Sequence, residues 1–224
     1  MSSQRGAGAI DFAGAWRAWL EGAGDPRLDP IADLAYWENA ASEADGWPTQ
    51  SCAVTLATVA ANVGAMDTVL DVGAGTGRFA LPLARQCRAV TLLDHSPAML
   101  AVASAKAAAA GISNVSFVEA TWEEADVEPH DVVLTAWSLY RVLDIEGALQ
   151  RMIAATRRTL LVLAPDADPA QEARGETAGY LYILGALRDL GARASLEFVW
   201  EPQPDGPAVA VPLVRWSRSS EGGG

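Results

Sequence analysis

The stretch VLDVGAGTG, residues 69–77, determines how the fold of this 224-residue chain is interpreted. It is a short apolar segment that ends in three glycines, Gly73, Gly75 and Gly77, spaced two residues apart. An apolar strand that runs into such a turn is typical of a nucleotide site, because glycine leaves the backbone open to close approach by a ligand. A dinucleotide fingerprint would need its third glycine one residue later, and a phosphate loop would need a following Lys-Ser/Thr pair. Neither is present, so the turn suits a different ligand.

Strand and helix patterns alternate on both sides of this turn. Apolar segments of strand length occur at 67–73, 89–94, 114–120, 130–137 and 158–166, and helix patterns occur at 76–87, 96–111 and 145–157. Such alternation predicts a parallel, doubly wound sheet with helices on both faces. Farther along, a helix is expected at 176–191, followed by two strands, 195–202 and 208–216, that would pair as an antiparallel hairpin at one edge. We therefore predict a Rossmann-like α/β fold with a seven-stranded, mostly parallel sheet.

The first 63 residues contain helix patterns and no strand pattern. Helices are expected at 10–22, 29–44 and 48–64, with Asp29 as a capping residue and Pro30 in the first turn of the second. We predict three regions: an N-terminal helical cap or lid at 1–63, the α/β domain at 64–216, and a disordered tail at 217–224.

Composition limits the function classes. The formal net charge of −12, with no run of basic residues, argues against a nucleic-acid partner. The N-terminus does not resemble a signal peptide, and no uncharged apolar segment is long enough for a membrane span. We expect a cytoplasmic protein, either a monomer or a homodimer, and the alanine- and arginine-rich composition is typical of a bacterium.

No metal site is expected from the two histidines and two cysteines. Cys52 and Cys87 lack the spacing of zinc ligands and are interpreted as buried free thiols. His130 begins an expected strand at the end remote from the glycine turn, so a structural role is predicted for it.

A carboxylate stands at the end of each of the first two expected strands. Asp71 would repel a pyrophosphate but suits a ligand that carries positive charge, such as S-adenosylmethionine, which has an ammonium group, a sulfonium and no phosphate. Asp94 ends the strand at 89–94, where an acid can accept hydrogen bonds from both ribose hydroxyls. NAD enzymes share the second feature, so the choice of cofactor depends on Asp71 and the glycine spacing.

Three segments together resemble the successive motifs of class I S-adenosylmethionine-dependent methyltransferases: VLDVGAGTGRFALPLA, TLLDHSPAML and HDVVLTAWSLYRVLD. The resemblance covers roughly residues 65–165. It implies S-adenosyl-L-methionine as cofactor, S-adenosyl-L-homocysteine as product, and methyl transfer as the reaction. The cofactor-binding residues that it implies are Asp71, Gly73, Ala74, Gly75, Gly77, Asp94, His95, Ser96, Met99, Ala120, Thr121, Trp122, Thr135, Ala136 and Trp137.

Aromatic residues supply the candidates for an acceptor site. Trp37, in a segment that resembles the lid of that family, Tyr140, directly after the fourth strand, and Tyr180 are predicted to bind the acceptor, and Trp47 is a further aromatic of the cap. Tyr140 is also the one candidate for a catalytic group. Core positions are expected for four other tryptophans: Trp16, Trp19, Trp200 and Trp216.

The sequence thus predicts an enzyme that methylates a small molecule, with no nucleic-acid or membrane partner. Two alternatives remain open at this point: a protein or tRNA methyltransferase, and a protein that binds S-adenosylmethionine without catalysis.

Overall fold

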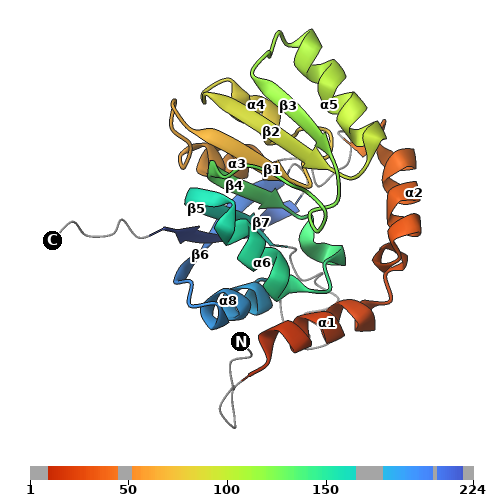
Figure 1. Ribbon diagram of the computed structural model, residues 1–224, viewed down its shortest axis with the longest axis vertical. Helices are drawn as coiled ribbons and strands as arrows, with labels where there is room; N and C mark the ends of the chain where they lie inside the picture. Colours follow the sequence, from red (N-terminus) through yellow and green to blue (C-terminus); the bar gives the residue numbers. More distant parts are fainter. Residues whose placement is uncertain (1–9, 45–51, 165–178, 204–205, 219–224) are drawn as a thin grey trace, which may run out of the picture.

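One mixed sheet forms the centre of the molecule (Figure 1). The computed structural model describes residues 10–44, 52–164, 179–203 and 206–218. Within these ranges the sheet has seven strands in the order β3-β2-β1-β4-β5-β7-β6. Their bounds are β1 (Thr68–Val72), β2 (Ala89–Asp94), β3 (Val115–Glu119), β4 (His130–Ala136), β5 (Thr156–Leu163), β6 (Ala194–Gln203) and β7 (Gly206–Ser217). All pairs are parallel except those of β7, which runs antiparallel to both β5 and β6. The predicted Rossmann-like fold with its C-terminal hairpin is confirmed.

Helices cover both faces of this sheet. Those of the described residues are α1 (Phe12–Ala23), η1 (Pro26–Leu28), α2 (Pro30–Ala40), α3 (Ala53–Ala60), α4 (Ala80–Ala84), α5 (Pro97–Ala109), η4 (Leu139–Arg141), α6 (Ile145–Ala154) and α8 (Gly179–Asp189). As predicted, Asp29 caps α2, its carboxylate accepting hydrogen bonds from the amides of Ile31 and Ala32. Figure 1 shows α1, α6 and α8 together below the sheet, and α2 lying apart from them beside α5.

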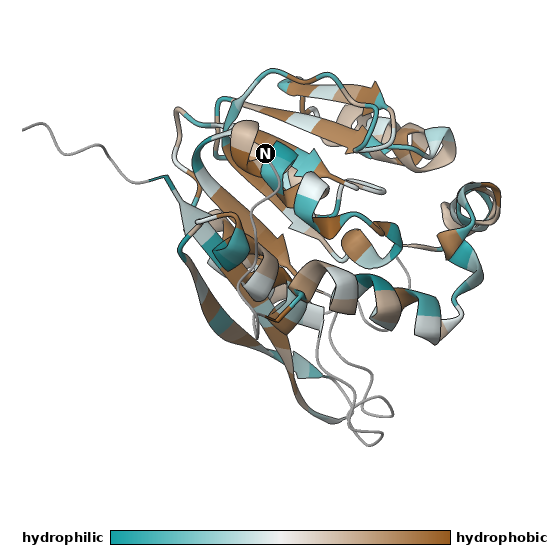
Figure 2. Ribbon diagram, turned by 60° about the horizontal axis from the view of Figure 1, so that its bottom comes forward, coloured by the Kyte–Doolittle hydropathy of each residue, from teal (hydrophilic) through white to brown (hydrophobic). Residues whose placement is uncertain are grey.

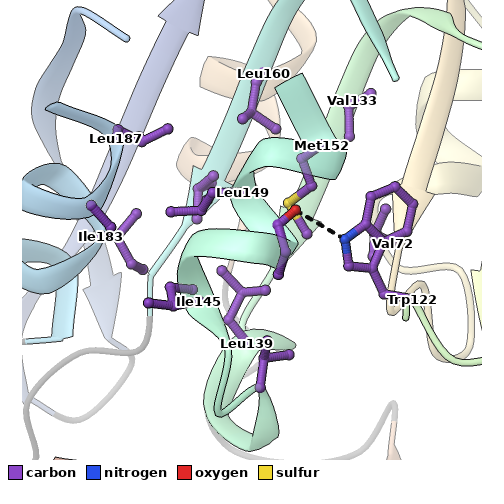
Figure 3. Close-up of a cluster of buried hydrophobic side chains, with 14 of the residues drawn as sticks. Val72, Trp122, Val133, Leu139, Ile145, Leu149, Met152, Leu160, Ile183 and Leu187 are labelled. Atoms are coloured by element: carbon purple, nitrogen blue, oxygen red, sulfur yellow. Dashed lines mark hydrogen bonds between the residues drawn. The ribbon is translucent and has the colours of Figure 1, made fainter. Parts of the chain in front are cut away.

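Alternation of side chains along the strands divides the core between the two faces. On β1, Leu70 and Val72 pack with α1, α6 and α8, whereas Val69 packs with α3, α4 and α5. Figure 2 shows the hydrophobic residues concentrated along the strands. The first cluster is drawn in Figure 3, where the indole of Trp122 donates a hydrogen bond to the carbonyl of Ala148 at 3.1 Å. Asp71 lies between the core residues Leu70 and Val72 of β1, and its side chain is also buried.

Helix α1 is part of this core. Trp16 is fully buried, and its indole N–H donates to the carbonyl of Val142 at 2.7 Å. Its predicted core position is confirmed, and Trp19 and Trp216 pack against the same cluster. The prediction for Trp200 is wrong, because its side chain is 63% exposed. Trp200 lies on the edge strand β6 and points to the face opposite to that of the buried Val199.

The predicted boundary at residue 217 is also corrected. Ser217 is the last residue of β7, and the guanidinium of Arg218 donates to the carbonyls of Ile153 and Thr156. The remaining predicted tail, Trp47 and the start of the helix expected at 176–191 lie outside the described residues. In the described part of the chain, no helix has the length and apolarity that crossing a membrane requires.

Candidate functional site

A cavity of about 470 Å³ lies at the carboxyl ends of β1, β2 and β4. This volume is within the range of about 300–1,000 Å³ found for small-molecule sites. One end is formed by the glycine turn and the residues after β2, and the other by α3 and the β6–β7 hairpin. The site therefore lies where ligands bind in open α/β sheets.

Backbone geometry explains the glycines of the turn. Gly73, Gly75 and Gly77 all have positive φ, at 72°, 54° and 79°, which L side chains rarely adopt. A Cβ atom on Gly73 would lie 2.3 Å from the side chain of Ser138, so the turn could not pack against the segment after β4. Gly73 and Gly75 line the cavity, whereas Gly77 packs against Leu81 and Leu92 behind it.

Asp71 places a carboxyl group in the cavity wall under strong desolvation. Its side chain is 2% exposed, and burial, together with the nearby charge of Asp94, raises its pKa to about 7. A cationic group beside it would relieve both effects. Asp71 is thus suited to a ligand that brings a positive charge.

Asp94 connects the glycine turn to the end of β2. One carboxylate oxygen accepts from the amide of Gly75 at 2.8 Å and the other from the amide of Ser96 at 2.9 Å. Burial nevertheless raises its pKa above the usual value, although both hydrogen bonds act in the opposite direction. A carboxylate oxygen can accept a further hydrogen bond, and Asp94 lines the cavity, as binding of ribose hydroxyls would need.

The segment after β4 contains a strained residue. Trp137 has φ 54° and is alone among the described non-glycine residues in having positive φ. Its ring lies 5.7 Å from that of Phe79, and both line the cavity. Beside it, the hydroxyl of Ser138 donates to the carbonyl of Val72 and contacts the hydroxyl of Thr135. These bonds hold the loop in a conformation that places the indole in the cavity wall.

Helix α2 contributes a polar cluster beside the cavity. The hydroxyl of Tyr140 donates to Asp33 at 2.6 Å and accepts from the indole of Trp37 at 2.5 Å. Burial and the carboxylate of Asp33 raise the pKa of Tyr140 well above its usual value. Tyr140 is therefore a phenol that donates a hydrogen bond, and a role as general base is disfavoured.

Most predicted cofactor residues gather around the cavity: Asp71, Gly73, Ala74, Gly75, Asp94, His95, Met99, Ala120, Trp122, Ala136 and Trp137 line it, as do Trp37 and Tyr140. Four other predicted residues do not line the cavity: Gly77, Ser96, Thr121 and Thr135. Ser96 caps α5, and Thr121 donates to Glu124. Tyr180 is not brought to the cavity, because its ring packs against Phe198 with centroids 5.3 Å apart.

Several lining residues were not predicted from the sequence. Arg78, Arg141, Glu201, Gln203 and residues 209–212 of β7 all border the cavity. Glu201 is buried and caps the N-terminus of α3, where it accepts from the amide of Thr55 and from its hydroxyl, both at 2.8 Å. No local sequence pattern marks Glu201, Gln203 or residues 209–212, since they reach the site only through the β6–β7 hairpin. Arg141 lies in η4, next to the predicted Tyr140. Arg78, which directly follows the glycine turn, is the exception that its position could have indicated.

His130 lies away from the cavity, which His95 lines. His130 lies at the start of β4, where one ring nitrogen is 2.9 Å from the hydroxyl of Thr91 and the other 2.7 Å from the carbonyl of Glu128. The structural role predicted for it agrees with these contacts. The described ranges contain no group of three or more His, Cys, Asp or Glu residues that could hold a metal ion.

Comparison with known proteins shows what this domain is similar to. Residues 69–160 match the family model described as a methyltransferase domain. The chain is 31% identical over 151 residues to an uncharacterized protein of Haemophilus influenzae, covering 62% of this chain and 56% of that one. It is 40% identical over 72 residues to the 23S rRNA (uracil(1939)-C(5))-methyltransferase RlmD of Photobacterium angustum, covering 32% of this chain and 30% of the relative. The chain thus spans about half the length of the first relative and less of the second.

Solved structures agree on the fold. The N-methyltransferase NodS from Bradyrhizobium japonicum, in complex with S-adenosyl-L-homocysteine, has a TM-score of 0.65 and 18% identity, over 83% of this chain and 97% of that one. Together with the strand order, these findings agree with the predicted resemblance: residues 69–160 match a methyltransferase domain, and the chain has the fold of solved methyltransferases such as NodS.

Proposed function

We propose that the chain binds S-adenosylmethionine in the cavity and transfers its methyl group to a small-molecule acceptor. In this proposal Asp71 pairs with the ammonium group, and Asp94 accepts hydrogen bonds from the ribose hydroxyls. The open backbone of Gly73, Ala74 and Gly75 lets the cofactor approach. His95, Met99, Ala120 and Trp122 would surround the adenine, with Ala136 and Trp137 beside the methionine part. The family match of residues 69–160 and the complex of NodS with S-adenosyl-L-homocysteine support this assignment.

The reaction requires little from the protein beyond positioning. The acceptor nucleophile forms a bond to the methyl carbon as the carbon–sulfur bond breaks. The electron pair of the broken carbon–sulfur bond stays on sulfur and neutralises the sulfonium. Holding the two reactants in line is worth on the order of 7–11 kcal/mol. An amine or thiolate acceptor needs no base at the transfer step. The raised pKa of Tyr140 fits a mechanism in which its phenol orients groups and removes no proton.

The acceptor would occupy the end of the cavity formed by α3 and the hairpin. Its walls combine Phe79, Trp137 and the aliphatic residues 209–212 with a few polar groups, Thr55, Glu201 and Gln203. Because Glu201 already accepts hydrogen bonds from Val54 and Thr55, much of its charge is balanced within the wall. A largely apolar or planar molecule with one or two hydrogen-bonding groups fits this lining. One continuous cavity that joins Asp71 to this apolar end is the observation that carries the proposal.

An RNA acceptor is the main alternative, since RlmD methylates 23S rRNA by its description. The match to RlmD covers less than a third of either protein, and the net charge of −12 opposes binding to a phosphate backbone. Protein methylation and cofactor binding without catalysis are further alternatives.

We also propose that residues 1–63 act as a cap, with α2 as its lid, over a catalytic unit at 64–216, and that the protein is cytoplasmic.

A product-release assay tests the function. The purified chain would be incubated with S-adenosylmethionine and pools of small amines, phenols and carboxylic acids, and, in parallel, with total RNA and with protein extract. Formation of S-adenosylhomocysteine that depends on a small-molecule pool supports the proposal. Turnover with RNA or protein alone contradicts it, as does binding of the cofactor without turnover in any pool.

A further inference from the structure

Helix α2 buries its charge and exposes its apolar residues. The buried residue of this helix is Asp33, at 0% exposure, whereas Ile31 is 81% exposed and Leu34 and Tyr36 are also exposed. A surface helix normally packs its apolar stripe on the core. A small apolar cluster joins the C-terminal end of α2 to α5. The polar contacts of the helix with the rest of the protein centre on two carboxylates, Asp33 and Glu38.

Both oxygens of Asp33 contact groups from other segments, and Oδ1 also contacts Trp37 of the same helix. Oδ1 accepts from the hydroxyl of Tyr140 at 2.6 Å and from the indole of Trp37 at 3.0 Å. Oδ2 lies 3.0 Å from Nε2 of His95 and 3.1 Å from Nε of Arg141. Burial alone would raise the pKa of Asp33, yet His95, Tyr140 and Arg141 outweigh it and lower the pKa below its ordinary value. Asp33 is thus an ionised group in a dry site.

The partners of Asp33 come from the two sides of the cavity. His95 follows β2, and its Nδ1 lies 3.6 Å from Oδ1 of Asp94. Tyr140 and Arg141 lie in η4, after β4, and all three partners line the cavity together with Trp37. One carboxylate therefore connects the lid helix, the segment after β2 and the segment after β4.

We propose that Asp33 is a positioning residue of this site: it holds α2 over the cavity and fixes His95, Tyr140 and Arg141 against the bound cofactor. The inference rests on the proposed function, since it assumes that an adenosyl cofactor occupies the cavity. Release of the product would require α2 to withdraw, which breaks the Asp33 contacts. Asp33 then sets the rate of cofactor exchange without touching the reacting atoms.

Energetics favour a functional reason for this arrangement over a purely structural one. Placing a carboxylate in a dry site costs several kcal/mol, and apolar residues of similar volume often serve stability as well or better. The cost is offset only when the partners are in place: Oδ1 accepts hydrogen bonds from Tyr140 and Trp37, and Oδ2 lies at ion-pair distance from His95 and Arg141. Withdrawal of α2 would break the contacts with His95, Tyr140 and Arg141 together. Such a cluster therefore favours the position of α2 over the cavity relative to positions in which the helix has withdrawn.

A second anchor on the same helix allows a discriminating test. Glu38 accepts from the hydroxyl of Ser96 at 2.7 Å and from the amide of Ala98 at 3.1 Å, so it also attaches α2 to the body. It contacts neither Tyr140 nor Arg141. If attachment of the lid alone matters, loss of either acid should have the same effect, whereas a positioning role predicts a larger effect at Asp33.

The experiment measures dissociation of S-adenosylhomocysteine by stopped flow for the wild type, Asp33→Asn, Glu38→Gln and Glu43→Gln. Glu43 is exposed and lies three residues after the end of α2. Glu43→Gln therefore removes one negative charge close to the helix without breaking its attachment, and it serves as the matched control. We expect dissociation at least tenfold faster for Asp33→Asn, less than threefold faster for Glu38→Gln, and unchanged for Glu43→Gln. Should Asp33→Asn fail to fold, Tyr140→Phe removes one donor to the same carboxylate and is expected to accelerate dissociation at least threefold.

A wild-type rate in folded Asp33→Asn, or equal acceleration in Asp33→Asn and Glu38→Gln, overturns the inference. So does a wild-type rate in Tyr140→Phe. In each of these outcomes the wild type still binds the ligand, so the proposed function survives. Failure of the wild type to bind S-adenosylhomocysteine would instead refute the proposed function itself.

Discussion

Replacing Asp71 by Asn is expected to stabilise the ligand-free protein while it removes cofactor affinity. The carboxyl group is 2% exposed, and its pKa rises from 3.8 to about 7 on folding because of burial and the charge of Asp94. A group whose pKa is raised in the folded state binds protons more tightly there than in the unfolded chain. The free energy of unfolding therefore falls as the pH rises from about 4 to about 7.

The size of the effect follows from this shift. One pKa unit corresponds to about 1.4 kcal/mol, so at pH 8 the ionised Asp71 costs about 4 kcal/mol relative to a neutral isostere. At pH 5 the carboxyl is protonated in the folded state, and the cost falls to about 2 kcal/mol. Asparagine keeps the shape and an acceptor oxygen. The stabilisation by Asp71→Asn should thus be largest at pH 8 and shrink at lower pH.

Urea unfolding of both proteins without ligand at pH 8 and pH 5 measures this difference. Titration with S-adenosylhomocysteine at pH 8 then reports the functional loss, which is expected to exceed tenfold because the ammonium group loses its counter-charge. Equal or lower stability of the variant at pH 8 would refute the idea that Asp71 is held at the expense of stability for a cationic ligand.

Three further results are expected. Affinity for S-adenosylhomocysteine should fall about tenfold from pH 8 to pH 6, because protonation of Asp71 near pH 7 depletes the form that binds an ammonium group; a flat calorimetric profile would exclude this role. Asp94→Ala should weaken the same binding at least tenfold, about 1.4 kcal/mol, since the ribose acceptor and the partner of the Gly75 amide are both lost; unchanged affinity in a folded variant contradicts the ribose assignment. Glu201→Gln should lower the free energy of unfolding at pH 7 by about 1 kcal/mol, because the amides and hydroxyl of α3 hold the pKa of Glu201 below 4.5 and favour its charge. That difference should narrow as the pH falls below 4.5, and a difference that grows in acid would show that the cap does not depend on charge.

Local patterns were sufficient to predict the sheet. The central strands β1, β4 and β5 have the apolar content of segments buried on both faces, and β2 was placed at its observed bounds, Ala89–Asp94. Helix lengths were less accurate: the pattern at 76–87 predicted a long helix, but α4 spans only Ala80–Ala84, since the preceding residues form the glycine turn. Turn residues therefore shorten elements that apolar spacing alone would extend.

The site was predicted where it depends on the turn and missed where it depends on tertiary packing. Asp71 and Asp94 end adjacent strands, and strand ends in a parallel sheet meet at one edge. Asp33 lies in a helix whose apolar residues are exposed, and no periodicity distinguishes an acid that will be buried there. Glu201 reaches the cavity only because β7 inserts between β5 and β6. The same hairpin carries Trp200 outward and holds Phe198 against Tyr180.

The most direct test of the account is a calorimetric titration of the purified chain at pH 8 with S-adenosylmethionine, S-adenosylhomocysteine and NAD. The account predicts micromolar binding of the two adenosyl ligands, each at one site, and no binding of NAD. Binding of NAD, or the absence of binding by both adenosyl ligands, would contradict the central claim that the Asp71 cavity holds the methyl donor.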